Sequence, residues 1–233
     1  MICLLNAAQE AGIPFQAVSL KVVGNADDLF GLSRSTLIED GAKPDFGETA
    51  TSLFTGSDEP VYSFIGGVRH VRLGLRRLDD PSEPAFDFVL PDAPRLPLEG
   101  GVDVIPADAV REVIRRSFAK RLKILGKVTR LAPGRVVQFA PPPPVSDRWL
   151  QPFLLKHNAK SATLPNRMLR WKLWRLTVDV IRLHAEGLGA RFLDCPPEAV
   201  DADGFMRDEL VRNVTHGNLA FGMLLLNQIR GPR

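Results

Sequence analysis

The sequence contains few of the residues that build disulfide frameworks or metal centres. It has 2 cysteines, Cys3 and Cys195, and 4 histidines, which stand at positions 70, 157, 184 and 216. The cysteines provide neither a disulfide framework nor a metal-ligand spacing, and the histidines are too scattered to suggest a zinc site. We therefore expect no metal and no cofactor, and this cysteine usage fits a reducing compartment.

Long apolar runs are missing as well. No stretch reaches the ~20 residues that a membrane-spanning helix needs. The opening MICLLNAAQEAG has neither the basic region nor the cleavage site of a secretory signal. From these two absences we expect a cytoplasmic protein that has no membrane partner.

Motifs that bind phosphate or nucleic acid are also lacking. The glycine pairs do not have the G-x-G-x-x-G spacing, and no segment matches a phosphate-binding loop. The net charge is +3 and the pI is about 9.1, with arginine and lysine concentrated in residues 106–125. No aromatic residues are interleaved with this charge, so we interpret it as a solvated face and expect no nucleic-acid partner.

The sequence does contain enough apolar residues for one core. Of its 233 residues, 45% are hydrophobic and 24% are charged. A chain of this length and composition can bury one sizeable core. We predict a single domain that covers residues 1–233.

Short apolar runs alternate with helical patterns along the chain. Glycine and proline bound the apolar runs, which predicts strands at 13–23, 60–67, 134–140 and 190–194. Helical spacing predicts an opening helix that ends near Gly12, and further helices at 106–125, 167–186 and 217–229. This alternation predicts an α/β fold, a three-layer α/β/α sandwich around a parallel sheet.

Two of the predicted helices carry an apolar stripe that should face the core. The stripes consist of Val110, Val113, Ile114, Phe118, Leu122 and Leu125 in the first helix, and of Leu169, Leu173, Leu176, Val180 and Leu183 in the second. We expect Trp149, Trp171 and Trp174 to pack as well.

Residues that follow the predicted strands are candidates for a site, because ligands of parallel sheets bind at the carboxyl ends of strands. These residues are Gly24-Asn25, Gly66-Gly67-Val68-Arg69-His70, the prolines 141–144, and Cys195-Pro-Pro. The glycines allow backbone N–H groups to approach a ligand, and they are also ordinary turn residues. We interpret the proline run as a stiff loop wall.

The end of the chain carries the most specific pattern, FLDCPPEAVDADGFMRDELVRNVTHGNLAFGMLLLNQI. It resembles the end of an SGNH (GDSL-type) hydrolase, where a strand leads to a PPEAL-D-DGF element, a D-x-x-H-x-N element and a final helix. SFIGGVRH and VVQFAPPPPVSD resemble the third block of that family and the strand and loop that follow it. The resemblance covers nearly all of residues 13–231 and implies a flavodoxin-like fold.

The resemblance implies a serine ester hydrolase, an esterase or deacetylase that acts on a small ester or an acylated sugar. In the family, a serine attacks the acyl carbon, a histidine takes its proton, and an aspartate three residues earlier orients the histidine. Backbone N–H groups and an asparagine stabilise the oxyanion. By this resemblance His216 is the base, Asn213 replaces the aspartate, Gly24 and Gly67 are block glycines, and Val68 replaces the oxyanion asparagine.

Both replacements predict a weakened site. Asn213 can accept a hydrogen bond from the imidazole but carries no charge, and the same change in a serine protease costs roughly 10⁴ in rate. Val68 offers no donor, and losing one oxyanion donor costs roughly 10² to 10³ in rate. Asp208 or Glu209 could supply the missing acid, and the sequence places neither of them.

The family's serine has no counterpart in these residues. The first block of the family is a strand followed by G-D-S and a helix, and MICLLNAAQEAGIPF resembles that helix. We expect the chain to be truncated, because an empty central strand position would expose backbone on both neighbouring strands. Residues 1–233 alone should then be inactive or very weak. The alternative is a non-catalytic relative that binds a ligand or a partner protein.

The histidines and Asn218 also have purely local explanations. His216 could open the last helix, with Thr215 as the N-cap, and Asn218 could be a cap or turn residue. His70 could be a surface residue of a helix after the glycine block. None of these explanations requires a site.

Overall fold

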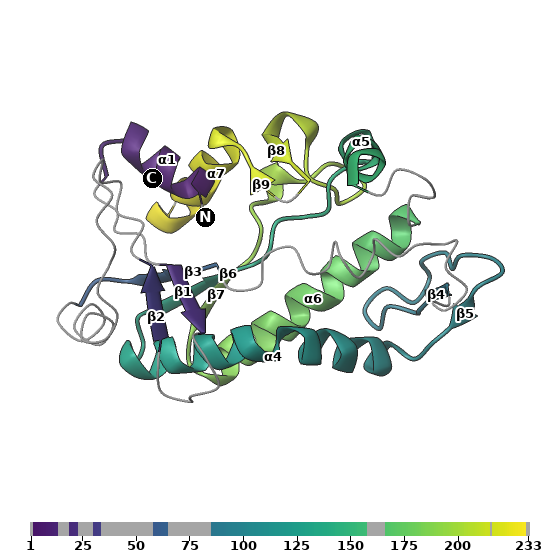
Figure 1. The fold of residues 1–233 in the computed structure, drawn as a ribbon, viewed down its shortest axis with the longest axis horizontal. Coiled ribbons are helices and arrows are strands. Elements are labelled where there is room, and N and C mark those ends of the chain that lie inside the picture. The colour runs from purple at the N-terminus through teal and green to yellow at the C-terminus, as the bar shows by residue number, and fades with distance from the viewer. Residues whose placement is uncertain are drawn as a thin grey trace.

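The computed structural model describes residues 2–13, 19–22, 30–33, 58–64, 85–157, 166–214 and 216–231. These residues form a mixed α/β structure with a parallel sheet and helices on both of its faces (Figure 1). The α/β class that the sequence predicts is therefore confirmed. Gly24, Gly67, Val68 and His70 lie outside the described residues.

The parallel sheet contains three strands in the described part of the chain. These are β3 (Val61–Ser63), β6 (Val136–Phe139) and β7 (Arg191–Leu193), in the order β3-β6-β7. Val61 lies opposite Val136, and Val137 lies opposite Arg191. Each strand falls within a run that the sequence predicts as a strand. All residues of the central strand β6 are buried, as expected for a strand that is covered on both faces.

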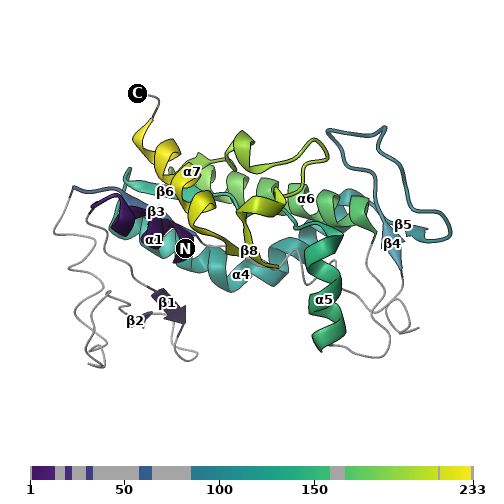
Figure 2. The same ribbon diagram turned by 90° about the horizontal axis from the view of Figure 1, so that it is seen from above.

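Helices make the long connections that parallel neighbours need. α4 (Ala107–Leu131) precedes β6, and α5 (Asp147–His157) and α6 (Arg167–Gly187) lie between β6 and β7. Figure 1 shows α4 and α6 on one side of the sheet, and α1 (Ile2–Glu10) and α7 (Leu219–Arg230) on the other. In the view from above, α1 again lies beside α7 (Figure 2).

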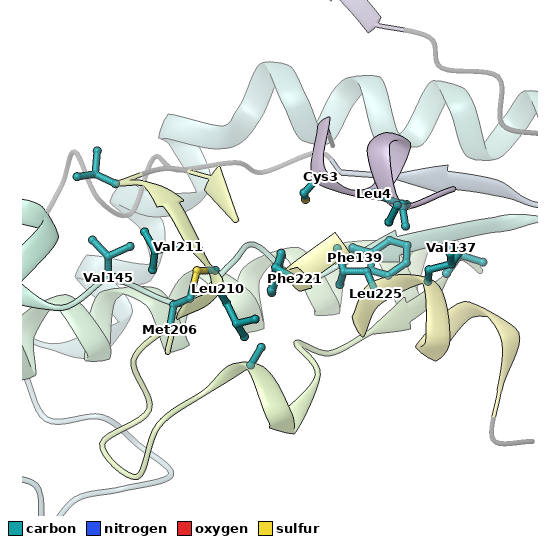
Figure 3. Close-up of a cluster of buried hydrophobic side chains, with 14 of the residues drawn as sticks. Cys3, Leu4, Val137, Phe139, Val145, Met206, Leu210, Val211, Phe221 and Leu225 are labelled. Atoms are coloured by element: carbon teal, nitrogen blue, oxygen red, sulfur yellow. The ribbon is translucent and has the colours of Figure 1, made fainter. Parts of the chain in front are cut away.

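The side chains of β6 alternate between two hydrophobic clusters. Val137 and Phe139 pack in a cluster with residues of α1 and α7, including Leu4 and Phe221 (Figure 3). Val136 packs on the opposite face, in a cluster that includes residues of α4. Successive strand residues point to opposite faces, so one short strand contributes to both cores.

The predicted apolar stripes of α4 and α6 meet in a further cluster, together with Phe88 and Leu90. Two members of the stripes are exposed instead, Val113 by 51% and Leu183 by 63%, so the expectation is wrong for them. Both lie on the edge of a stripe, which the partner helix does not cover. Trp149 and Trp171 pack against these clusters and Trp174 is buried, as expected.

The first predicted strand, at 13–23, differs from expectation. Within it the structure describes β1 (Ser19–Val22), which pairs antiparallel with β2 (Phe30–Ser33). The prediction that this run joins the parallel sheet is therefore wrong for residues 19–22. Only residues 23–29 separate β1 from β2, and parallel pairing needs a crossover of about a dozen residues or more.

Residues 85–106 fold against α6 around a buried ion pair. Within them β4 (Phe86–Asp87) and β5 (Asp103–Val104) pair in parallel. Lys172 Nζ lies 3.0 Å from both carboxylate oxygens of Asp87 and donates to the Pro97 carbonyl at 2.9 Å. The backbone N–H groups of Phe88 and Glu99 donate to the same carboxylate. Both buried charges are thus paired and hydrogen-bonded, which their burial requires.

Gly222 sets the distance between α1 and α7. A Cβ at this position would collide with the carbonyl oxygen of Cys3 in α1. The two helices therefore pack with the backbone of one against the backbone of the other. None of the helices in the described ranges is both long and apolar enough to cross a membrane.

Candidate functional site

The chain segments that leave the carboxyl ends of β6 and β7 meet each other. The prolines 141–144 follow β6, and the Pro144 carbonyl accepts a hydrogen bond from Met206 N at 2.9 Å. The Ser146 hydroxyl donates to Asp208 Oδ1 at 2.7 Å. The proline-rich loop and residues 194–218 therefore lie together at this edge of the sheet.

Two buried side chains of α6 hold the proline-rich loop in place. The indole N–H of Trp174 donates to the Pro141 carbonyl at 3.0 Å. The guanidinium of Arg170, whose side chain is only 4% exposed, donates to the Val145 carbonyl at 3.0 Å and pairs with Asp147. The interpretation of this loop as a stiff wall is consistent with these contacts, which the sequence pattern did not indicate.

The polar run near the end of the chain folds into a short hairpin. A 3-10 turn, η2 (Asp208–Leu210), leads into β8 (Val211–Asn213), which pairs antiparallel with β9 (His216–Gly217). Asn213 and His216 are directly opposite each other and exposed, whereas Val211 and Val214 are buried. The alternation of polar and apolar residues therefore places the amide and the imidazole on the solvent side.

Asn213 and His216 form a hydrogen-bonded pair, as the resemblance implies. The ring Nδ1 of His216 lies 2.9 Å from the amide oxygen Oδ1 of Asn213. An amide oxygen can only accept, so Nδ1 carries the proton in this arrangement and Nε2 keeps its lone pair. This is the tautomer that a general base acting through Nε2 requires.

The electrostatic surroundings of His216 favour the neutral ring. Desolvation by the neighbouring protein is the main cause that holds the pKa of His216 below its ordinary value, and positive charge, including that of Arg212, adds to it. At neutral pH the imidazole is therefore unprotonated and able to accept a proton. A carboxylate at position 213 would raise the pKa of His216 instead.

The two acids that could replace the missing aspartate are engaged elsewhere. Asp208 accepts from Ser146 and forms an ion pair with Arg148 at 3.5 Å. Glu209 accepts from Arg207 Nε at 2.7 Å. The partner that faces Nδ1 of His216 is thus the neutral amide of Asn213.

Cys195 follows β7 by two residues, and its thiol is a candidate nucleophile at this edge. Burial is the main cause that raises the pKa of its thiol to about 12, with smaller effects from Asp194 and Glu198. At neutral pH almost none of it is the thiolate that reacts as a nucleophile. We assign Cys195 to the packing of the core, where it contacts the cluster around Phe139.

The helix that follows His216 begins too late in the sequence for His216 to be its first residue. α7 starts at Leu219 and its N-cap is Asn218, whose side-chain oxygen accepts from Phe221 N at 3.2 Å. The explanation in which Thr215 caps the helix and His216 opens it is therefore wrong, although Thr215 itself lies outside the described residues. The interpretation of Asn218 as a cap is confirmed.

The described residues include no group of three histidine, cysteine, aspartate or glutamate side chains that could hold a metal ion. Comparison with known proteins adds no relative: no protein-family model matches the chain, and no curated protein sequence matches it either.

Proposed function

We propose that this chain is an SGNH-type hydrolase domain in which His216 occupies the position of the general base. The hydrogen bond between His216 Nδ1 and Asn213 Oδ1 carries this proposal. It joins the two residues that the family pattern pairs, with the spacing that the pattern predicts. The proposed fold is the flavodoxin-like three-layer sandwich, and the order β3-β6-β7 with helices on both faces supports it.

The proposed chemistry is the hydrolysis of a small ester or of an acylated sugar in the cytoplasm. Nε2 of the neutral His216 takes the proton of a nucleophilic hydroxyl, while Asn213 holds the ring in the productive tautomer. The family's nucleophile is the serine of a G-D-S block, and residues 1–233 contain no such block. We therefore propose that these residues alone have no appreciable turnover.

The second candidate function is a non-catalytic domain of the same fold that binds a ligand or a protein. A specific observation favours it: Asp208 and Glu209 bind other groups, and the partner of the imidazole at Nδ1 is the uncharged amide of Asn213. Asn213 itself would stabilise an imidazolium poorly, since its amide is uncharged.

Hydrolysis of p-nitrophenyl acetate separates the two candidates. We would compare residues 1–233 with the same residues preceded by the sequence that the reading frame encodes before Met1. If that sequence includes a G-D-S block, the extended chain should be weakly active. His216→Ala should abolish this activity, while Asn213→Asp and Val68→Asn should each raise it by about one order of magnitude or more.

The control for this experiment is His184→Ala. His184 lies on α6, where its Nε2 is 3.1 Å from the Leu122 carbonyl oxygen of α4, so it is a partly buried histidine in the helical layer. Its replacement should leave the activity intact. Turnover that survives His216→Ala in the extended chain would contradict the hydrolase proposal. No turnover in any extended variant would favour the binding domain.

A further inference from the structure

We propose that Asn218 is a positioning residue for His216, because it fastens the hairpin to both the preceding turn and the following helix. This inference rests on the proposed role of His216 as the base. Asn218 stands two residues after His216, at the point where β9 ends and α7 begins. In the sequence, Asn218 is the last residue of the D-x-x-H-x-N element, and its local explanation is a cap or turn residue.

Both the side chain and the backbone of Asn218 form hydrogen bonds with neighbouring elements. Its Nδ2 donates to the Glu209 carbonyl at 2.6 Å, and its backbone N–H donates to the Leu210 carbonyl at 2.8 Å. Its Oδ1 accepts from Phe221 N, and its carbonyl accepts from Gly222 N at 3.1 Å. One residue thus connects η2, which precedes β8, to the first turn of α7.

The hairpin also lies directly on that first turn. A Cβ at Gly217 would collide with the ring of Phe221. Phe221 is only 5% exposed and belongs to the cluster that contains Phe139 of the central strand (Figure 3). The backbone of Gly217, next to His216, is therefore in close contact with the Phe221 ring, which is buried in the core.

The backbone contacts of the hairpin matter more for a His216 that is paired with Asn213 than for one that is paired with an aspartate. A carboxylate forms a charge-assisted bond to an imidazole, and such bonds are roughly twice as strong as neutral ones. The neutral amide of Asn213 gives His216 a weaker orienting bond, and the hairpin is exposed to water. The ring position then depends to a larger extent on the backbone that Asn218 fixes.

We call the hydrogen bond from Asn218 Nδ2 to the Glu209 carbonyl the clamp. It can be separated from the N-cap bond to Phe221 N because the two bonds use different atoms of Asn218. The cap needs the oxygen Oδ1 as acceptor, whereas the clamp needs the Nδ2 donor and its reach to Glu209. Serine is a good N-cap and is too short to make the second bond. Asn218→Ser therefore removes the clamp and keeps the cap, and Asn218→Ala removes both.

The experiment measures the ring nitrogen chemical shifts of His216 by NMR in residues 1–233, together with thermal unfolding. In the unmodified chain the shifts should report the Nδ1–H tautomer. In Asn218→Ser they should move towards a mixture with the Nε2–H tautomer, while the melting temperature stays close to that of the unmodified chain. Asn218→Ala should show the same change in the shifts and a lower melting temperature.

The matched control is Asn166→Ser at the N-cap of α6, where the asparagine oxygen accepts from Met168 N at 2.7 Å. It changes an equivalent cap and should leave the His216 shifts unchanged. If Asn218→Ser does not fold, the uncharged Asn218→Thr also keeps an N-cap acceptor, loses the Nδ2 donor and gives the same test of the tautomer.

Unchanged His216 shifts in the folded clamp variant would overturn the inference. This readout needs no turnover, so an inactive chain does not count against the positioning role. Conversely, an active extended chain whose His216 shifts ignore Asn218 would refute the positioning role and leave the proposed function standing.

Discussion

At the scale of single residues, His216 has the tautomer that the proposed base requires, and its partner at Nδ1 is an uncharged amide. The bond to Asn213 keeps the proton on Nδ1, and desolvation keeps the pKa below its ordinary value. A neutral ring accepts a proton readily, but the amide of Asn213 carries no charge that would stabilise the imidazolium that then forms. The pair therefore preserves the geometry of a base and its orienter without the electrostatic contribution.

Asn213→Asp should raise the pKa of His216. A carboxylate 2.9 Å from Nδ1 favours the protonated ring, and this acts against the desolvation that lowers the pKa in the present chain. An NMR titration of the His216 ring signals measures the change. Asn213→Ala is the control, because it removes the orienting bond without adding charge and should not raise the pKa in this way. An unchanged pKa in Asn213→Asp would contradict the arrangement described for this pair.

At the scale of secondary-structure elements, the contact between α1 and α7 depends on one glycine. Gly222→Ala places a methyl group against the Cys3 carbonyl, and neither backbone can move without disturbing the core (Figure 3). Overpacking of this kind costs about 1–3 kcal/mol. We expect the free energy of unfolding, measured by denaturant titration, to fall by that amount.

The control for this change is Gly126→Ala in the middle of α4. A Cβ there would lie 3.7 Å from the nearest atom of Leu188, an ordinary contact. Alanine also restricts the unfolded chain, so this variant should be more stable by roughly 0.5–1 kcal/mol. Equal stability of the two variants would contradict the close backbone packing inferred at Gly222.

The longest helices and the strands of the parallel sheet could be predicted from local patterns, whereas α5, the short strands and the pairing of the strands could not. The helical spacing of 106–125 and 167–186 locates α4 and α6, but α4 runs through Gly126 to Leu131 because Gly126 is buried against Leu188. Val113 and Leu183 are exposed, so periodicity identifies an apolar stripe but not how far the buried part of it extends. The antiparallel partner of β1 follows from the short connection to β2, which no periodicity reports.

The same limit applies to the candidate site. The resemblance of the tail to the SGNH family implies the pairing of Asn213 with His216, and a hairpin that the sequence did not predict brings the two residues together. The contacts of Asp208 with Ser146 and of Lys172 with Asp87 join residues 62 and 85 positions apart. Their pairing depends on tertiary packing, and a single sequence gives no signal for it.

At the scale of the whole molecule, the proposed site requires two segments that are distant in sequence to meet at one place. The hairpin with His216 lies beside the segments that leave the carboxyl ends of β6 and β7. The glycine block 66–68 follows β3, the neighbour of β6 in the same parallel sheet. In a hydrolase site the base and the oxyanion donors must reach one acyl group, so we predict that His216 lies within about 10 Å of Gly67. Gly24, for which the sequence predicts the same distance, follows β1, which pairs with β2 in a separate sheet.

A nitroxide label on Val68→Cys tests this convergence most directly. The native thiols should not compete for the label, since Cys3 is buried and burial raises the pKa of Cys195 to about 12. The control label is placed on Val104→Cys in β5, an exposed position that lies well away from the hairpin in Figures 1 and 2. The account predicts that the label at 68 strongly broadens the NMR signals of His216 and Gly217, that reduction of the nitroxide restores them, and that the label at 104 leaves them sharp. Sharp His216 signals with the label at 68 would contradict a shared site.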